Sequence, residues 1–275
     1  MLTVVTITTV LLAVLWSLRY PWWKPAVSLT SPRILMYHMI CDHLPGTRFN
    51  GLRVCPQRFD RQLAWLCRRG WQFRFLSEVL SAESAQQPLS GKICVITFDD
   101  GYADNLYNAL PILQRHGAVA TLYLVQHREH NDWSVKKKAH HHEGELAREA
   151  KLTDGEVETL LASGCFELGG HSATHADFSK LHPTARREEI ESSKSALEAR
   201  FGLPLQTYAY PFGIYDSVDV ALVRDAGFTG AVTTRNGISR DLQAERFELR
   251  RVKVSGKKGQ LTFRLGMRMG WRTWV

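Results

Sequence analysis

The chain has 275 residues, of which 44% are hydrophobic and 23% charged, so disordered, collagen-like and low-complexity proteins are excluded. Its 35 Lys and Arg exceed its 27 Asp and Glu by 8, which favours anionic partners such as phosphates, acidic glycans or a membrane surface. No nucleic-acid-binding motif accompanies this charge, so we expect no nucleic-acid partner. Five cysteines without a Cys-x-x-Cys pair argue against a thiolate zinc site.

The N-terminus begins with an uncharged apolar stretch, residues 2–18. As a helix it would be roughly 26 Å long, close to the hydrocarbon thickness of about 30 Å. Aromatic residues within 20–23 are typical of a membrane interface. The pattern predicts a transmembrane anchor over 1–20 and a proline-containing linker over 21–32, with a cleaved signal peptide and a buried helix as alternatives.

The charges beside this stretch predict its orientation. Arg19, Lys24 and Arg33 all follow the apolar residues, and positive charge marks the cytoplasmic side. We therefore expect a single-pass protein of the cell (inner) membrane whose main domain faces the cytoplasm. The periplasm is the alternative.

Beyond the linker, apolar runs alternate with amphipathic segments. The runs predict buried strands at 34–38, 93–98, 118–125, 166–168, 207–210 and 230–233. The amphipathic segments and their capping residues predict helices at 59–70, 106–116, 153–163, 188–201 and 218–226. This alternation favours an α/β domain over 33–275, with a parallel sheet that forms either a barrel or a doubly wound layer.

Charged and imidazole side chains follow two of these strands. Asp99 and Asp100 end the strand 93–98, and burial of unpaired carboxylates is unfavourable unless a cation is present. His171 and His175 follow the strand 166–168 and would share one face of a helical turn. Two histidines and a carboxylate form a catalytic zinc pattern. Separately, however, the acidic pair also fits a turn or cap, and the histidines an incidental pair.

Two motifs together resemble the polysaccharide deacetylase (NodB-homology) family, carbohydrate esterase family 4. The motifs are Thr-Phe-Asp-Asp-Gly-Tyr at 97–102 and His-Ser-Ala-Thr-His at 171–175. Weaker matches are Tyr-Pro-Phe-Gly at 210–213, Asp-Ala-Gly-Phe at 225–228 and Met-Tyr-His at 36–38. The resemblance implies a distorted (β/α) barrel of the NodB-homology type, a divalent metal, most often zinc, and hydrolysis of N-acetyl groups from amino sugars.

The resemblance also implies roles for individual residues. Asp99 matches the family's general base. Asp100 matches a metal ligand, joined by His171 and His175. These assignments agree with the general chemistry, in which a metal acidifies water and a neighbouring unbound carboxylate accepts its proton.

The third motif supplies the remaining substrate contacts that the resemblance implies. The backbone N–H of Phe212, which follows Pro211, matches a donor to the oxyanion. Tyr102 and Tyr210 are candidates for the wall of the sugar pocket, with packing in the core as the alternative.

The sequence departs from the family at two positions. Ala209 replaces the arginine that orients the base, and the stretch 249–254 lacks the histidine that serves as general acid. We expect Arg251 to take the place of the arginine beside Asp99, with a surface salt bridge as the alternative. His38, at the end of the first strand, is the candidate acid, with a structural histidine as the alternative.

These patterns predict a metal-dependent N-deacetylase of an amino sugar in a cell-envelope glycan. The substrate would be lipid-linked, or part of a lipopolysaccharide or exopolysaccharide, and close to the membrane that the N-terminal helix anchors. A deformylase of a lipid-linked formamido sugar is one alternative. A catalytically silent barrel that binds glycan or acts as a scaffold is another.

Overall fold

The computed structural model describes residues 2–20, 22–87, 89–129 and 144–270. Its strands are β1 (Arg33–Tyr37), β2 (Trp71–Phe73), β3 (Lys92–Asp99), β4 (Ala120–Leu124), β5 (Phe166–Gly170), β6 (Thr207–Ala209), β7 (Gly230–Asn236) and β8 (Leu249–Lys253). All of their pairings are parallel, in the order β1-β8-β7-β6-β5-β4-β3-β2. Because β1 also pairs with β3, seven strands close into a barrel, and β2 pairs with the first residues of β3.

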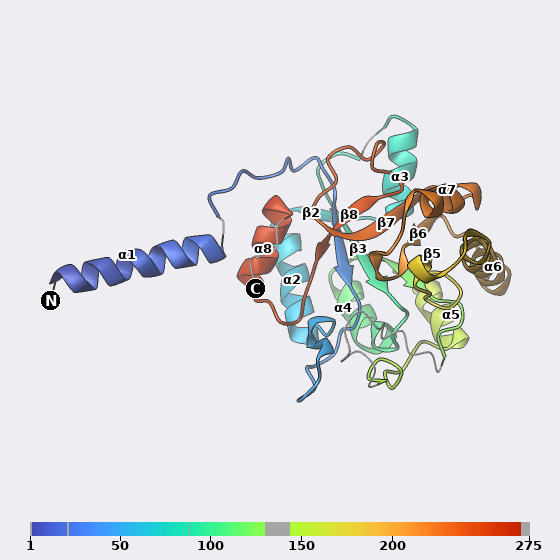
Figure 1. Cartoon of the computed structure of the whole chain (residues 1–275), viewed down its shortest axis with the longest axis horizontal. Helices are drawn as coiled ribbons and strands as arrows, with labels where there is room; N and C mark the ends of the chain where they lie inside the picture. Colours follow the sequence, from blue (N-terminus) through green and yellow to red (C-terminus); the bar gives the residue numbers. More distant parts are fainter. Residues whose placement is uncertain (1, 21, 88, 130–143, 271–275) are drawn as a thin grey trace.

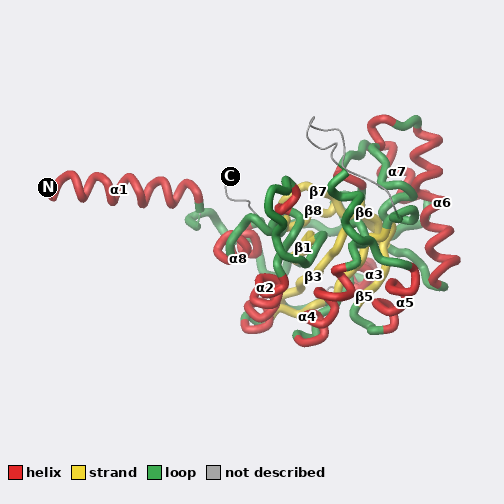
Figure 2. The backbone as a smooth tube through the Cα atoms, turned by 90° about the horizontal axis from the view of Figure 1, so that it is seen from below, coloured by secondary structure: helices red, strands yellow, loops and turns green. Residues whose placement is uncertain are grey.

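Helices surround the strands of this barrel, except for the first, α1, which projects away from it (Figures 1 and 2). They are α1 (Leu2–Arg19), α2 (Pro56–Arg68), α3 (Leu76–Ser84), α4 (Leu110–Arg115), α5 (Asp154–Ala162), α6 (Pro183–Phe201), α7 (Ser217–Asp225) and α8 (Gln260–Met269). A capping box at Thr153 begins α5, and α6 ends at Gly202 in the left-handed conformation. The predicted α/β barrel is therefore confirmed.

Alternate residues of each strand face two different cores. On β3, Cys94 and Ile96 pack in the large core that contains residues of α2 and α4–α8. Ile93 and Val95 pack in a smaller core inside the barrel, where residues of α3 close one end. Side chains two apart share a face of a strand, so the inner row of β3 continues to Asp99 at the opposite end. This register places the acidic motif in the mouth of the barrel.

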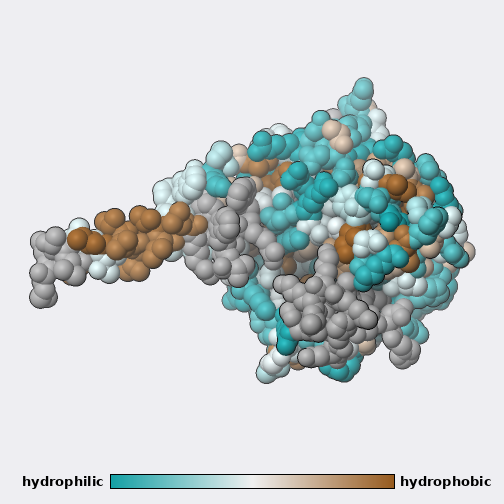
Figure 3. All heavy atoms as spheres, viewed as in Figure 1, coloured by the Kyte–Doolittle hydropathy of each residue, from teal (hydrophilic) through white to brown (hydrophobic). Residues whose placement is uncertain are grey.

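The predicted transmembrane anchor is wrong. Within the part of the chain that the structure describes, no helix combines the length and the apolar character that crossing a membrane requires. Helix α1 has 18 residues, including several threonines, and spans roughly 27 Å. It is an apolar rod that projects from a largely hydrophilic body (Figure 3). The predicted single-pass localisation in the inner membrane is therefore also wrong, and the predicted attachment to a membrane through this helix is not supported.

Three local features also differ from the sequence-based expectation. The predicted helix 106–116 begins as a π-helix, η2 (Asn105–Ala109), and continues as α4. The predicted helical turn at 171–175 is an irregular loop. Strands β2 and β8 and helix α3 were not predicted, and in β8 three of the five residues are basic, which hides the apolar run expected of a buried strand.

Candidate active site

The acidic motif lies on a tight turn at the end of β3. Asp99 is the last residue of the strand, and Asp100 and Gly101 both adopt left-handed conformations, with φ of 78° and 76°. A side chain at position 101 would have its Cβ 2.6 Å from Leu124 Cδ1. Glycine is therefore required here, and the turn buries both carboxylates at the mouth of the barrel.

Asp100, His171 and His175 converge in this mouth. Asp100 Oδ1 lies 3.3 Å from the Nε2 atom of each histidine, and the three side chains are buried. Their potential ligand atoms all lie within 4.8 Å of one another. Burial alone would raise the pKa of Asp100, but hydrogen bonds and charge from the two histidines hold it well below its ordinary value.

Hydrogen bonds hold the His171 ring and the backbone of His175 in place. The Nδ1 atom of His171 lies 2.7 Å from the Ala209 carbonyl oxygen, and because a carbonyl only accepts, Nδ1 donates to it. This contact orients the ring so that Nε2 faces Asp100. His175 donates its backbone N–H to the Ser172 hydroxyl at 2.9 Å. The loop thus brings the two imidazoles together, as the sequence analysis expected of a helical turn.

Unusual backbone conformations gather at this site. Among the described residues, five non-glycine positions have positive φ, and four of them belong to the site motifs: Asp100, Ser172, His175 and Phe212, with Gln86 the exception. Such conformations are unfavourable for L-residues and persist where the surroundings enforce them.

Arg251 lies beside Asp99, as the sequence predicted for the missing arginine. Its two terminal nitrogens donate to the two carboxylate oxygens at 2.6 and 2.7 Å, and the guanidinium is completely buried. It also donates to Thr97 Oγ1 and to the Thr233 carbonyl, both at 2.9 Å. Burial alone would raise the pKa of Asp99, but the charge and hydrogen bonds of Arg251 hold it below its ordinary value.

His38 lies near the same carboxylate. Its Nε2 is 4.0 Å from Asp99 Oδ2, and its side chain is 15% exposed. This distance exceeds that of a direct hydrogen bond, and part of the ring is exposed. The structure therefore brings His38 and Arg251 together beside Asp99.

The third motif forms the wall next to His175. Pro211 begins a 3-10 turn, η4 (Pro211–Gly213), in which Phe212 has a φ of 56°. The Phe212 ring meets the His175 ring edge-on, with centroids 4.2 Å apart. Gly213 is also constrained, because a Cβ there would lie 1.9 Å from Thr234 Oγ1.

The two candidate tyrosines have different surroundings. Tyr102 is buried at the mouth in a cluster with Met39, against which Phe212 also packs. Tyr210 packs in the large core, stacks on Tyr215 at 4.3 Å and donates its hydroxyl to a backbone carbonyl. The structure thus brings Tyr102, but not Tyr210, to the neighbourhood of the metal-ligand candidates. Their contact with substrate remains a prediction.

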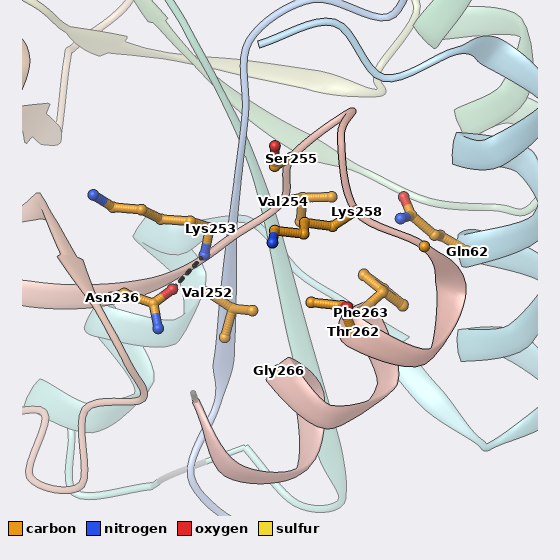
Figure 4. A pocket seen from close by; sticks show the side chains of 11 residues that line it. Gln62, Asn236, Val252, Lys253, Val254, Ser255, Lys258, Thr262, Phe263 and Gly266 are labelled. Atoms are coloured by element: carbon orange, nitrogen blue, oxygen red, sulfur yellow. Dashed lines mark hydrogen bonds between the residues drawn. The ribbon is translucent and has the colours of Figure 1, made fainter. Parts of the chain in front are cut away.

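A small pocket lies beside β8, between this strand and α8 (Figure 4). Its volume of about 20 Å³ is close to that of one water molecule. Lys253 donates its backbone N–H to Asn236 Oδ1 at 3.1 Å, while its side chain points away from the pocket. This pocket is too small for a sugar and contains none of the site residues described above.

Sequence reasoning missed the side chains that surround Arg251. Thr97 accepts one of its hydrogen bonds, and the Tyr123 ring lies 5.8 Å from the guanidinium carbon. Thr97 lies two residues before Asp99 on the same face of β3, so the alternation of side chains along the strand could have predicted that it lies near the base. Tyr123 lies within an apolar strand, and nothing in the sequence distinguishes it from the other core residues of that strand.

Known proteins share this architecture and these motifs. The polysaccharide deacetylase family profile matches residues 86–231, more than half of the chain. A protein of Bacillus subtilis (strain 168), provisionally named polysaccharide deacetylase YxkH, is 28% identical over 222 residues, which cover 81% of this chain and 71% of the relative. An 80-residue segment is 34% identical to the poly-β-1,6-N-acetyl-D-glucosamine N-deacetylase of Escherichia coli K12, covering 29% of this chain and 12% of that protein.

The polysaccharide deacetylase BC0361 from Bacillus cereus has a similar solved structure, with a TM-score of 0.69 and 26% identity over 86% of this chain and 69% of that one. The Streptococcus pyogenes deacetylase PplD shares the fold with a TM-score of 0.69 and 24% identity, covering 84% of this chain and 94% of that one. From the profile match and the motifs in the barrel mouth, we conclude that the chain is an enzyme of the polysaccharide deacetylase family.

Proposed function

We propose that residues 33–275 form a metal-dependent catalytic domain that removes N-acetyl groups from an amino-sugar polymer. The observation that carries this proposal is the buried triad of one carboxylate and two imidazoles next to a second, arginine-paired carboxylate. The first group is suited to hold a cation and the second to accept a proton.

The donor set fits a divalent metal such as zinc. Asp100, His171 and His175 offer one oxygen and two nitrogens, and three protein ligands with an open position are typical of catalytic zinc sites. The hydrogen bond from His171 Nδ1 to Ala209 is the kind of contact that orients a ligand imidazole. When bound, the metal would act as a Lewis acid that acidifies water and polarises the acetyl carbonyl.

Asp99 is suited to act as the general base. The bidentate contact with Arg251 keeps the carboxylate ionised and fixed in the mouth of the barrel. As water forms a bond to the acetyl carbon, Asp99 accepts a proton from it. The N–H of Phe212 donates to the oxygen on which negative charge develops.

His38 completes the proton balance. The amine leaves poorly unless its nitrogen gains a proton as the C–N bond breaks. His38 lies on the same side of the mouth as Asp99 and supplies that proton. Acetate and a free amino sugar are the products, and the proton held by Asp99 returns to solvent or to His38.

A named relative supports the choice of substrate class. This relative is a poly-β-1,6-N-acetyl-D-glucosamine N-deacetylase. We therefore propose an N-acetylglucosamine polymer of the cell envelope as the substrate.

Acetate release from β-1,6-linked N-acetylglucosamine oligomers tests this proposal. We expect release by the zinc-loaded wild type, loss on chelation and recovery when zinc is returned. Asp99→Asn should lower turnover by about 10²–10⁴-fold, whereas Asp225→Asn, on the exposed end of α7, should not change it. Release that persists in chelator, or that is undiminished in Asp99→Asn, would refute the mechanism.

A further inference from the structure

The segment that carries His38 is held by the first turn of η2. The backbone carbonyl of His38 accepts a hydrogen bond from Asn105 Nδ2 at 2.9 Å. Two residues later, the N–H of Ile40 donates to Asp104 Oδ1 at 3.0 Å, and its carbonyl accepts from Asn108 Nδ2 at 2.7 Å. Three side chains of one turn therefore bind three backbone groups of residues 38–40.

Asn105 is the centre of this arrangement. It is completely buried, and its Nδ2 donates both to the His38 carbonyl and to Asp104 Oδ1, each at 2.9 Å. Its Oδ1 has no hydrogen-bond partner among the described residues. A buried amide oxygen without a partner is unfavourable. The two hydrogen bonds that Nδ2 donates must therefore compensate this cost, and they are the structural reason for an asparagine at position 105.

The chain connectivity ties this turn to the catalytic groups. Asp99 and Asp100 lie just before η2, and the irregular π geometry replaces regular helix at Asn105–Ala109. Single π-turns inside helices often occur at functional sites. One short stretch of backbone thus carries the base, a metal-ligand candidate and the residues that fix His38 4.0 Å from Asp99.

We propose that Asp104, Asn105 and Asn108 are positioning residues that set the place of the His38 imidazole relative to Asp99. This inference rests on the proposed function, in which His38 protonates the leaving amine. A displacement of about 1 Å at a reacting group can lower a rate by about 100-fold. Loss of the contacts to residues 38–40 should therefore slow amine departure selectively, without affecting the metal ligands.

A pair of substrates separates positioning of the acid from general loss of structure. An N-acetyl hexosamine oligomer has a leaving amine that needs a proton, whereas 4-nitrophenyl acetate has a leaving group that does not. We expect Asn105→Ala and Asn108→Ala to lower kcat on the amide by roughly 10- to 100-fold, and to change ester hydrolysis by less than about threefold. In a His38→Ala background, Asn105→Ala should cause no further loss on the amide.

The matched control is Asn50→Ala. Asn50 also closes a nearby loop by a two-way amide contact, with Nδ2 to the Leu44 carbonyl at 2.8 Å and Oδ1 from the Leu44 N–H at 3.0 Å. That loop carries none of the site residues, so this variant should retain both activities.

Hydrogen exchange of the Ile40 amide gives a readout that does not depend on activity. We expect Asn105→Ala and Asn108→Ala to accelerate exchange at Ile40 by at least about tenfold, with zinc binding unchanged. Unchanged exchange in both variants, equal losses on amide and ester, or additive losses with His38→Ala would overturn the inference. If the wild type hydrolyses neither substrate, the proposed function fails, while the exchange result still decides whether these residues hold the segment.

Discussion

The two ends of the barrel differ in what they contain. At the closed end, Leu76, Val79 and Leu80 of α3 pack with Ile34 and Ile93 in an apolar core. At the mouth, carboxylates, imidazoles and a guanidinium are buried, and the turns that carry Asp100 and His175 have unfavourable backbone conformations. The comparison indicates that one end supplies stability and the other chemistry, as is general for barrels of parallel strands.

The largest effect on catalysis is expected at the mouth, from removal of a metal-ligand candidate. His171→Ala should abolish stoichiometric zinc binding and lower acetate release by more than about 10³-fold, because several kcal/mol of charge stabilisation are lost. Zinc content after dialysis and acetate release measure this. Full zinc occupancy in the variant would show that His171 is not a ligand.

A large effect on stability is expected from Arg251→Leu, which leaves the buried Asp99 carboxylate without its partner. Breaking a buried pair in this way lowers the free energy of unfolding by about 3–5 kcal/mol. Urea denaturation at pH 7 measures this effect. A loss below 1 kcal/mol would mean that solvent or another cation compensates Asp99.

At the closed end, a substitution should lower stability without lowering turnover. Leu80→Ala removes a fully buried side chain from the inner core and should lower the free energy of unfolding by about 2–5 kcal/mol. Turnover per folded molecule should stay within twofold of the wild type at a temperature where both are folded. A selective loss of turnover would contradict the separation of the two ends.

The smallest effect is a pH dependence at Asp104. Burial, together with the charge of Glu149, raises the pKa of this carboxyl to about 6, although hydrogen bonds from Ile40, Cys41 and Asn105 oppose the shift. The folded state therefore holds its proton more tightly than the unfolded state does, and stability falls as pH rises from about 4 to about 6.

Asp104→Asn keeps the oxygen that accepts from Ile40 but cannot ionise. Relative to the wild type, its free energy of unfolding should increase between pH 4 and pH 7, by at most about 3 kcal/mol. Parallel denaturation series at the two pH values measure the difference. A difference that is the same at both values would show that Asp104 titrates normally.

The sequence predicted the parts of the site that depend on strand register and motif spacing. Asp99 and Asp100 end an apolar strand, and the histidines follow another, so the convergence of Asp100, His171 and His175 could be expected. Arg251 could be proposed because Ala209 stands at the position where the family usually has an arginine. The structure shows Arg251 paired with Asp99.

Other features depend on contacts that no local pattern encodes. The loop at 171–175 reaches the geometry of a helical turn through the left-handed residues Ser172 and His175. Tyr210 directly follows β6 and continues its alternation, so that it packs in the outer core with Tyr208, whereas Ala209 packs in the inner core. The anchor prediction relied on the absence of charge in 2–18 and gave too little weight to the threonines and the short length of α1.

The most direct test of the central claim is X-ray absorption at the zinc edge of the enzyme loaded with one zinc per chain. The account predicts a shell of nitrogen and oxygen atoms with the multiple-scattering signature of two imidazoles, reduced to one imidazole in His175→Ala. A sulfur shell, or a spectrum unchanged by that substitution, would contradict the assignment of Asp100, His171 and His175 as the metal site.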